Sequence, residues 1–174
     1  MVKRITEEEC EALFKKYHTP AHVIGHCRAV SNTAVTIGRK LNGHGFTLDI
    51  DLIKGAGLVH DVARVSDKHW EVGAEILENL GYKDEAAIVR VHMPYDFHAF
   101  DKLDETDLVC LGDRLVKEDQ YVGLNDRIEY IIHKAGNAPE ITRKILQKKA
   151  QTERFMNCIE ETIGQTIDSL FMKG

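Results

Sequence analysis

The sequence predicts an all-α protein that folds as a single domain of 174 residues. Apolar residues recur at steps of three, four and seven along nearly the whole chain, which is typical of amphipathic helices. No stretch of real length alternates with the period of two that strands show. The length fits one domain, and 43% hydrophobic residues can supply a continuous core.

The first two helices are indicated by the residues at their starts. Thr6 and Glu9 form a capping-box pattern that opens a helix running to about Tyr17. Thr19 and Pro20 then fit the N-cap and first position of a second helix, where proline is favoured. This helix stops at residues 42–45 and carries an apolar stripe of Val23, Val30, Ala34, Ile37 and Leu41.

Shorter helices are predicted in the middle of the chain. Asp49 can cap a helix that runs to about Arg64. Its inward residues are Leu52, Ile53, Ala56, Val59 and Ala63. Further helices are expected near 69–80, 84–92, 104–117 and 125–135. Pro139 opens a long C-terminal helix, which we place at about 139–171.

Charge and composition narrow the classes of partner. The chain has 23 Lys and Arg against 28 Asp and Glu, a net charge of −5, and the basic residues are spread out. Proteins that track nucleic acid usually carry a basic stripe, so extended nucleic-acid binding is not expected, whereas a local basic pocket for a small phosphate compound is compatible. No apolar run approaches the roughly 18 residues of a membrane span, and residues 1–10 lack a signal-peptide pattern, so we expect a cytoplasmic protein.

The four cysteines are expected to be reduced and buried. They lie far apart and form no CxxC pair. This pattern is typical of cytosolic thiols rather than of a disulfide framework or a zinc site. The residues are Cys10, Cys27, Cys110 and Cys158.

Four polar residues fall on the apolar faces of three predicted core helices: His26, His60, the adjacent Asp61, and Asp113. Buried polar groups need partners. A single core histidine is usually satisfied by a backbone carbonyl, and a single aspartate by a cap or an arginine. Four such residues from three helices point instead to a shared site, and two imidazoles with two carboxylates suit a divalent metal ion.

The order His26, His60-Asp61, Asp113 resembles the H…HD…D signature of the HD-domain superfamily of metal-dependent phosphohydrolases. Sequence contexts are similar too: an apolar run precedes His60-Asp61, residues 69–74 match an HxxxGA element, and His92 and Asp113 lie in matching segments. The resemblance covers about residues 20–130 and implies a helical HD bundle.

The resemblance also implies the ligands. One divalent ion is assigned to His26, His60, Asp61 and Asp113, and a second to His69 and His92, with Asp61 bridging. The metal is one or two ions of Fe, Mn, Co, Ni, Zn or Mg. From position alone, His69 has a solvent-facing alternative at a helix start, and His92 has an alternative role at a helix C-terminus, where the dipole favours it. His22 is expected to support the site without being a ligand, and four histidines are expected in loops or on the surface: His18, His44, His98 and His133.

By this resemblance the protein hydrolyses a phosphate ester or anhydride of a nucleotide or similar small molecule, through a metal-activated water. Asp61 and Arg64 are the expected catalytic residues, with Arg64 binding phosphate or leaving group; the alternative for Arg64 is a solvated helix end. The arrangement is closer to bacterial diadenosine tetraphosphatases and to nucleotidyltransferase-associated HD groups than to other branches. Weaker candidates for substrate contact are Arg28, Lys68, Arg114, Lys117 and Arg127.

A different class of function stays open. A metal-bound HD module without turnover could act as a ligand-sensing or partner-binding domain. The presence of all six candidate ligands favours the enzyme, because a scaffold needs no open metal positions. The substrate and the oligomeric state are not fixed by the sequence, and a homodimer is compatible with it.

Overall fold

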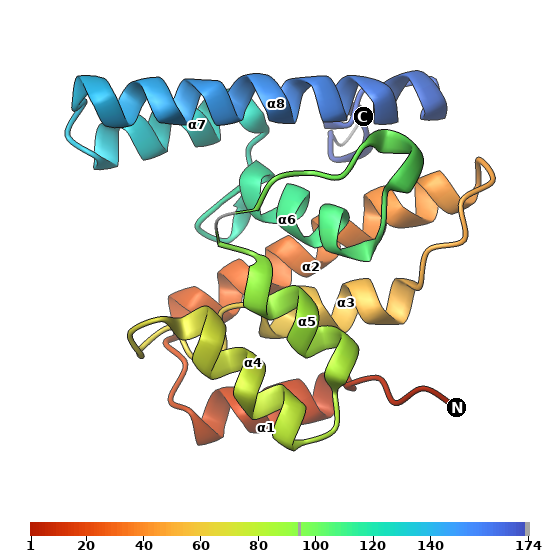
Figure 1. Cartoon of the computed structure of the whole chain (residues 1–174), viewed down its shortest axis with the longest axis vertical. Coiled ribbons are helices and arrows are strands. Elements are labelled where there is room, and N and C mark those ends of the chain that lie inside the picture. Colours follow the sequence, from red (N-terminus) through yellow and green to blue (C-terminus); the bar gives the residue numbers. More distant parts are fainter. Residues whose placement is uncertain (94, 173–174) are drawn as a thin grey trace.

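The computed structural model describes residues 1–93 and 95–172. Over these residues the chain forms eight α-helices and one small antiparallel hairpin, so the all-α prediction is confirmed (Figure 1). The α-helices are α1 (Glu7–Lys16), α2 (Ala21–Asn42), α3 (Ile50–Val59), α4 (His69–Asn79), α5 (Lys83–Val91), α6 (Glu105–Leu115), α7 (Leu124–Lys134) and α8 (Pro139–Ile163). The strands are β1 (Val116–Lys117) and β2 (Gln120–Tyr121), and short 3-10 helices cover Phe100–Lys102 and Asp168–Leu170.

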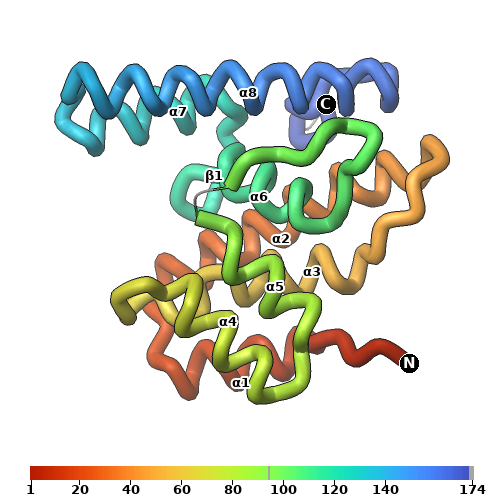
Figure 2. Tube along the Cα trace, viewed as in Figure 1, coloured from red at the N-terminus to blue at the C-terminus, as the bar shows by residue number. Residues whose placement is uncertain are grey.

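The core consists of two apolar clusters that share the long helix α2. Its N-terminal half packs with α1, α4 and α5 through residues such as Val23 and Cys27. Its C-terminal half packs with α3, α6 and α8 through Ile37 and Leu41. Figure 2 shows the result, with α7 and α8 together at one end of the molecule and α1 and α4 at the other. Helices α2, α3, α5 and α6 lie between these two ends.

Glycines let two helices approach α2 closely. A Cβ on Gly57 of α3 would lie 2.8 Å from the Cα of Ser31, and one on Gly112 of α6 would lie 2.9 Å from the carbonyl oxygen of Val30. Both distances are too short for real atoms, so larger residues would push the helices apart. The segments that carry His60-Asp61 and Asp113 are therefore held against the helix that carries His26.

Two predicted helix ends were wrong. The C-terminal helix ends at Ile163 and not near 171, because Gly164 adopts a left-handed conformation with φ of 71°. The chain then folds back and buries Ile167, whose N–H donates to the carboxylate of Glu160. The helix capped by Asp49 ends at Val59 and not at Arg64, and turns with i to i+3 hydrogen bonds follow it.

Smaller differences concern a cap and a hairpin. Pro20, not Thr19, is the N-cap of α2, because the Thr19 hydroxyl donates to the carbonyl of Val62, 2.7 Å away. The helix expected over 104–117 ends at Leu115, and the hairpin that follows is too short to show a period of two. The capping box at Thr6 is present as predicted.

All four cysteine thiols are free. Cys158 is partly exposed and the other three are buried. Within the described residues, none of the helices is both long and apolar enough to cross a membrane.

Candidate metal centre

All six ligand candidates converge at one place. His26 comes from α2, His60 and Asp61 from the turn after α3, and the others from α4, the end of α5, and α6. Two triads of ligand atoms lie within 4.8 Å of one another, and both contain Asp61: His26, His60 and Asp61, and Asp61, His69 and His92. Ligands on one ion, with bonds of about 2.0–2.2 Å, lie up to about 4.4 Å apart, so small side-chain shifts suffice to close each triad.

The two oxygens of Asp61 face different histidines. Its Oδ1 lies 3.0 Å from Nε2 of His69 and 3.4 Å from Nε2 of His92. Its Oδ2 lies 3.7 Å from Nε2 of His60. A carboxylate placed in this way can bridge two ions.

Asp113 adds a second carboxylate on the His60 side of the centre. Its Oδ1 lies 2.8 Å from Nε2 of His26 and 3.7 Å from Nε2 of His60. One group of four ligand candidates therefore surrounds His60, and a group of three surrounds His69, with Asp61 in both.

Burial removes the solvent-facing alternative for His69, whereas His92 is the C-cap of α5, so its alternative role at a helix C-terminus stays open. His69 is 3% exposed and His92 is 5% exposed, so neither faces solvent at a helix end. His22, expected to support the site, is exposed and lines a cavity together with Asp61, His69 and His92. The four histidines expected in loops or on the surface are exposed.

Three of the four central histidines are fixed in the tautomer that a metal requires. Nδ1 of His26, His60 and His92 lies 2.7–2.8 Å from a backbone carbonyl oxygen. A carbonyl only accepts, so each Nδ1 carries the proton and each Nε2 presents a lone pair to the aspartates when the ring is neutral. For His60 and His92 the acceptor is the carbonyl three residues earlier, where the helix ends.

His69 has the opposite arrangement. Nη1 of Arg64 donates to its Nδ1 over 3.2 Å, so the ring proton lies on Nε2, toward Asp61. For a neutral imidazole to bind an ion through Nε2, that proton would have to move to Nδ1. In that form Nδ1 would be a donor, and the hydrogen bond from Arg64 would be lost.

Unsatisfied atoms and charge both fit a bound cation. Nε2 of His60 and of His69 are buried and have no hydrogen-bond partner among the described residues, which is rare for buried polar atoms. Burial alone would raise the pKa of Asp61, but the neighbouring imidazoles of His60, His69 and His92 hold it well below its usual range. Burial would lower the pKa of His60, but Cys27, Asp61 and Asp113 outweigh it and the pKa is raised. The centre therefore attracts positive charge, as protons or as metal.

A third cluster of possible ligands is structural. The carboxylate of Asp107 is fully buried and accepts from the Tyr95 hydroxyl at 2.7 Å and from the backbone N–H groups of His98 and Asp104 at 3.0 Å. These bonds fasten the segment 95–104 to the start of α6. With its oxygens already engaged, Asp107 is not a candidate for the metal.

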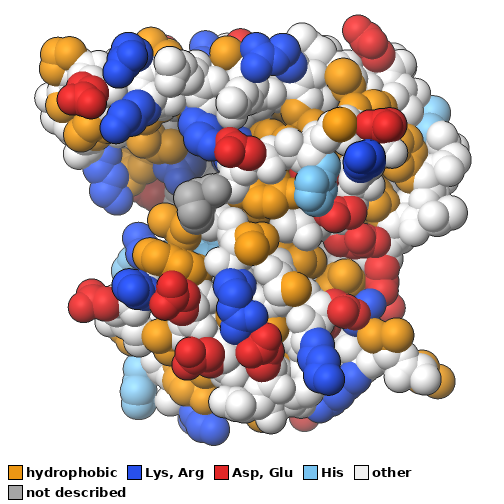
Figure 3. Space-filling view, in the orientation of Figure 1, with side chains coloured by type: hydrophobic (Ala, Val, Ile, Leu, Met, Phe, Trp, Pro, Cys, Tyr) orange, Lys and Arg blue, Asp and Glu red, His pale blue; other side chains and the backbone are white. Residues whose placement is uncertain are grey.

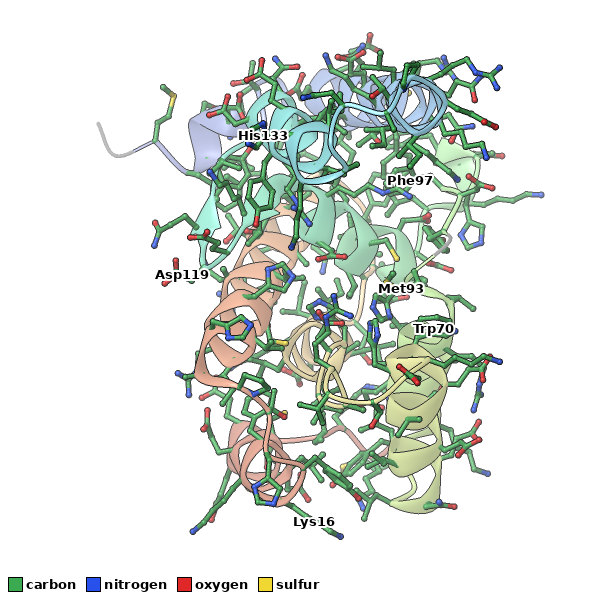
Figure 4. All side chains as sticks on the ribbon, turned by 90° about the vertical axis from the view of Figure 1, so that its left-hand side faces the viewer. Lys16, Trp70, Met93, Phe97, Asp119 and His133 are labelled. Atoms are coloured by element: carbon green, nitrogen blue, oxygen red, sulfur yellow. The ribbon has the colours of Figure 1, made fainter. Side chains whose placement is uncertain are left out.

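Five of the six ligand candidates, all except the fully buried His60, line a cavity of about 410 Å³. The outline of Figure 3 is indented between the α7–α8 end and α4, with Lys and Arg side chains beside the indentation. Figure 4 faces this side, with Met93 and Trp70 at one edge and α2 at the other. Basic side chains line the cavity: Arg64, Arg114, Arg127 and Lys134.

Sequence reasoning did not find every cavity residue. Tyr130 and Lys134 were not among the candidates, although they follow Arg127 by three and seven residues and so share one helix face. That spacing was the available signal. Arg28 pairs with Glu11 and Lys68 with Glu71, so these two weaker candidates belong to the surface.

The family model of the HD domain matches residues 23–131, which is more than half of the chain. The chain belongs to the HD domain family. The matched segment contains all six ligand candidates and Arg64. HD domains bind divalent metal ions and are generally metal-dependent hydrolases, and the two triads are the ligand groups that this HD domain offers.

Two curated relatives share part of this HD protein. An uncharacterised protein of Methanocaldococcus jannaschii is 35% identical over 71 residues, covering 39% of this chain and 42% of that protein. A protein of Thermoplasma volcanium named tRNA (cytidine(56)-2'-O)-methyltransferase is 30% identical over 165 residues, covering 76% of this chain and 47% of that protein. The chain thus spans less than half the length of each. No solved structure gives a significant match.

Proposed function

We propose that this HD protein is a metal-dependent phosphohydrolase that hydrolyses a phosphate ester or anhydride of a nucleotide or similar small molecule. The observation that carries the proposal is Asp61, whose two oxygens face separate histidine groups at the floor of a basic cavity. His26, His60 and Asp113 would hold one divalent ion and His69 and His92 the other, with Asp61 shared. Four imidazoles and two carboxylates favour Mn, Fe, Co, Ni or Zn over Mg.

Bound divalent ions supply a nucleophilic water at neutral pH and neutralise charge on the phosphoryl group. The chain's own residues supply the rest. Asp61 is ionised at neutral pH because its pKa is depressed, so it can hold cations and accept a hydrogen bond. Arg64 and Arg114 line the cavity without a carboxylate within 4.0 Å among the described residues, and a guanidinium in this position binds phosphoryl oxygens well.

Arg114 is held in place more firmly than Arg64. It donates to the Tyr95 carbonyl and, over 3.1 Å, to the Thr152 hydroxyl, and it lies over the Phe97 ring. Arg64 has the single bond to His69 and is otherwise exposed. We therefore assign phosphate positioning to Arg114 and a movable contact with the reacting phosphate or leaving group to Arg64.

The test is a substrate panel with matched variants. Nucleotides, dinucleoside polyphosphates and a short single-stranded RNA, included because one relative is named as a tRNA methyltransferase, are incubated with Mn²⁺, Fe²⁺, Co²⁺, Ni²⁺ or Mg²⁺. We expect hydrolysis of a panel compound, followed by chromatography of its products, that Asp61→Ala abolishes while helical circular dichroism is retained. Asp51→Ala, an exposed aspartate on α3, is the control. Metal-loaded protein that hydrolyses nothing in the panel would instead support the silent binding module.

A further inference from the structure

The cavity has a second charged wall that the metal centre does not explain. Arg127, Tyr130 and Lys134 lie on one face of α7 and line the same cavity as Asp61. Lys117, from β1, completes the group. Three cationic groups surround the Tyr130 ring. Their distances from the ring centroid are 4.8 Å for the Lys117 ammonium, 5.6 Å for the Arg127 guanidinium and 5.8 Å for the Lys134 ammonium.

These three cations are not neutralised within the protein. None of them has a carboxylate within 4.0 Å among residues 1–93 and 95–172. On the neighbouring helix α8, by contrast, Lys144 and Lys149 pair with glutamates and Lys148 pairs with Asp96. Of the three cations without such a partner, Arg127 and Lys134 line the cavity.

Arg127 also has an unsatisfied donor. Its Nε is buried and has no hydrogen-bond partner among the described residues. Buried donors without partners are rare, and like charges around one ring repel. The Tyr130 ring offsets part of this repulsion, because its negative face attracts cations. An anion in the cavity that Arg127 lines would balance these charges.

We propose that Arg127 and Lys134 form an anion subsite that holds a second phosphate group of the substrate while the reacting phosphate lies at the Asp61 centre. The Tyr130 ring positions the two cations, and the Lys117 ammonium adds positive charge beside it. The preferred substrates are then nucleotides with two or more linked phosphates, rather than monophosphates. A cavity of about 410 Å³ is within the range of small-molecule sites, roughly 300–1,000 Å³. The choice of reacting phosphate rests on the proposed function, whereas anion binding by α7 does not.

The decisive measurement is the equilibrium binding of ADP to the chelator-treated protein. Binding is measured by calorimetry at low and at high salt concentration. Without metal, the α7 wall is the expected anion site, and salt should weaken binding because the contacts are ionic. Arg127→Ala and Lys134→Ala should each weaken ADP binding about tenfold, which is 1.4 kcal/mol. Lys134 is exposed, so its variant keeps the fold. Arg143→Ala, an exposed arginine on α8 outside the cavity, should bind as wild type.

Activity provides the second measurement. In the metal-loaded enzyme, Lys134→Ala should raise KM for ADP or ATP and leave kcat and the KM for p-nitrophenyl phosphate unchanged, since that ester has one phosphate. ADP binding that depends on α7 in a protein without turnover would contradict the proposed function but support the subsite. Variants that bind ADP as wild type, or equal loss for one and two phosphates, would overturn the subsite. The subsite would also be overturned if a short oligonucleotide displaced ADP at a concentration below the Kd of ADP.

Discussion

Removing one histidine of the second triad should halve the metal content of the protein. His92→Ala takes one of three ligand atoms from the group around Oδ1 of Asp61 and leaves the four candidates around His60 intact. Loss of a residue that merely supports a ligand costs about 10–100-fold in metal affinity, so loss of a ligand itself should cost more than about 100-fold, or about 2.7 kcal/mol. At micromolar metal the second ion is then absent.

The assay is elemental analysis of protein freed of loosely bound metal, together with titration of the chelator-treated form. We expect about two ions in wild type, about one in His92→Ala and in His69→Ala, and two in His98→Ala, which removes an exposed histidine outside the centre. Asp61→Ala should weaken both ions, because both triads contain that residue. One ion in wild type and in every histidine variant would refute the shared carboxylate, and His69 and His92 would then be cavity residues.

Three further predictions concern charge and protons. Arg64→Ala should strengthen binding of the second ion several-fold in a metal titration, because the ion on His69 no longer competes with the Arg64 hydrogen bond, and it should slow hydrolysis. Metal binding at pH 7 should release protons, because the raised pKa of His60 keeps the imidazole protonated in metal-free protein. The release is measured as a binding enthalpy that depends on the buffer. The affinity for metal should therefore rise with pH up to the pKa of His60. Asp49→Ala should lower the free energy of unfolding by about 1–2 kcal/mol at pH 7, since it removes the cap of α3 and a partner of Arg4. The pKa of Asp49 is lowered on folding, so urea titrations should show this difference in full well above pH 3.8 and a smaller one below it.

The grouping of the six ligand candidates was predictable because the signals for it are local. Helical phase placed His26 and Asp113 on inward faces, and the His60-Asp61 pair and its context carried the family resemblance. The end of α3 was not predictable, because no glycine or proline follows Val59. The helix ends there because tertiary contacts fix the turn, including the Thr19 hydroxyl on the Val62 carbonyl. That turn is what brings Asp61 and Arg64 to the cavity.

The end of the C-terminal helix was signalled and overlooked. Gly164 stands in the apolar pattern that continues to Ile167 and Leu170, and the pattern alone favours a longer helix. The left-handed backbone at Gly164 reverses the chain, so Ile167 reaches the core from a different segment. A hydrophobic period reports burial, and two segments on either side of a turn can bury residues in the same phase.

The position of α7 could not be predicted, because it depends on a hairpin of six residues. The N–H groups of Val122 and Gly123 donate to the carbonyl of Leu115, which fastens the start of α7 to the end of α6. Gly123, with φ of 81°, permits the turn that brings α7 to the cavity. The same hairpin presents the carbonyl of Glu118 to Nδ1 of His26, 2.8 Å away. One short element therefore sets the tautomer of a ligand candidate and places the cationic wall, so the two sides of the cavity are held in a fixed relation even though α7 supplies none of the ligand candidates.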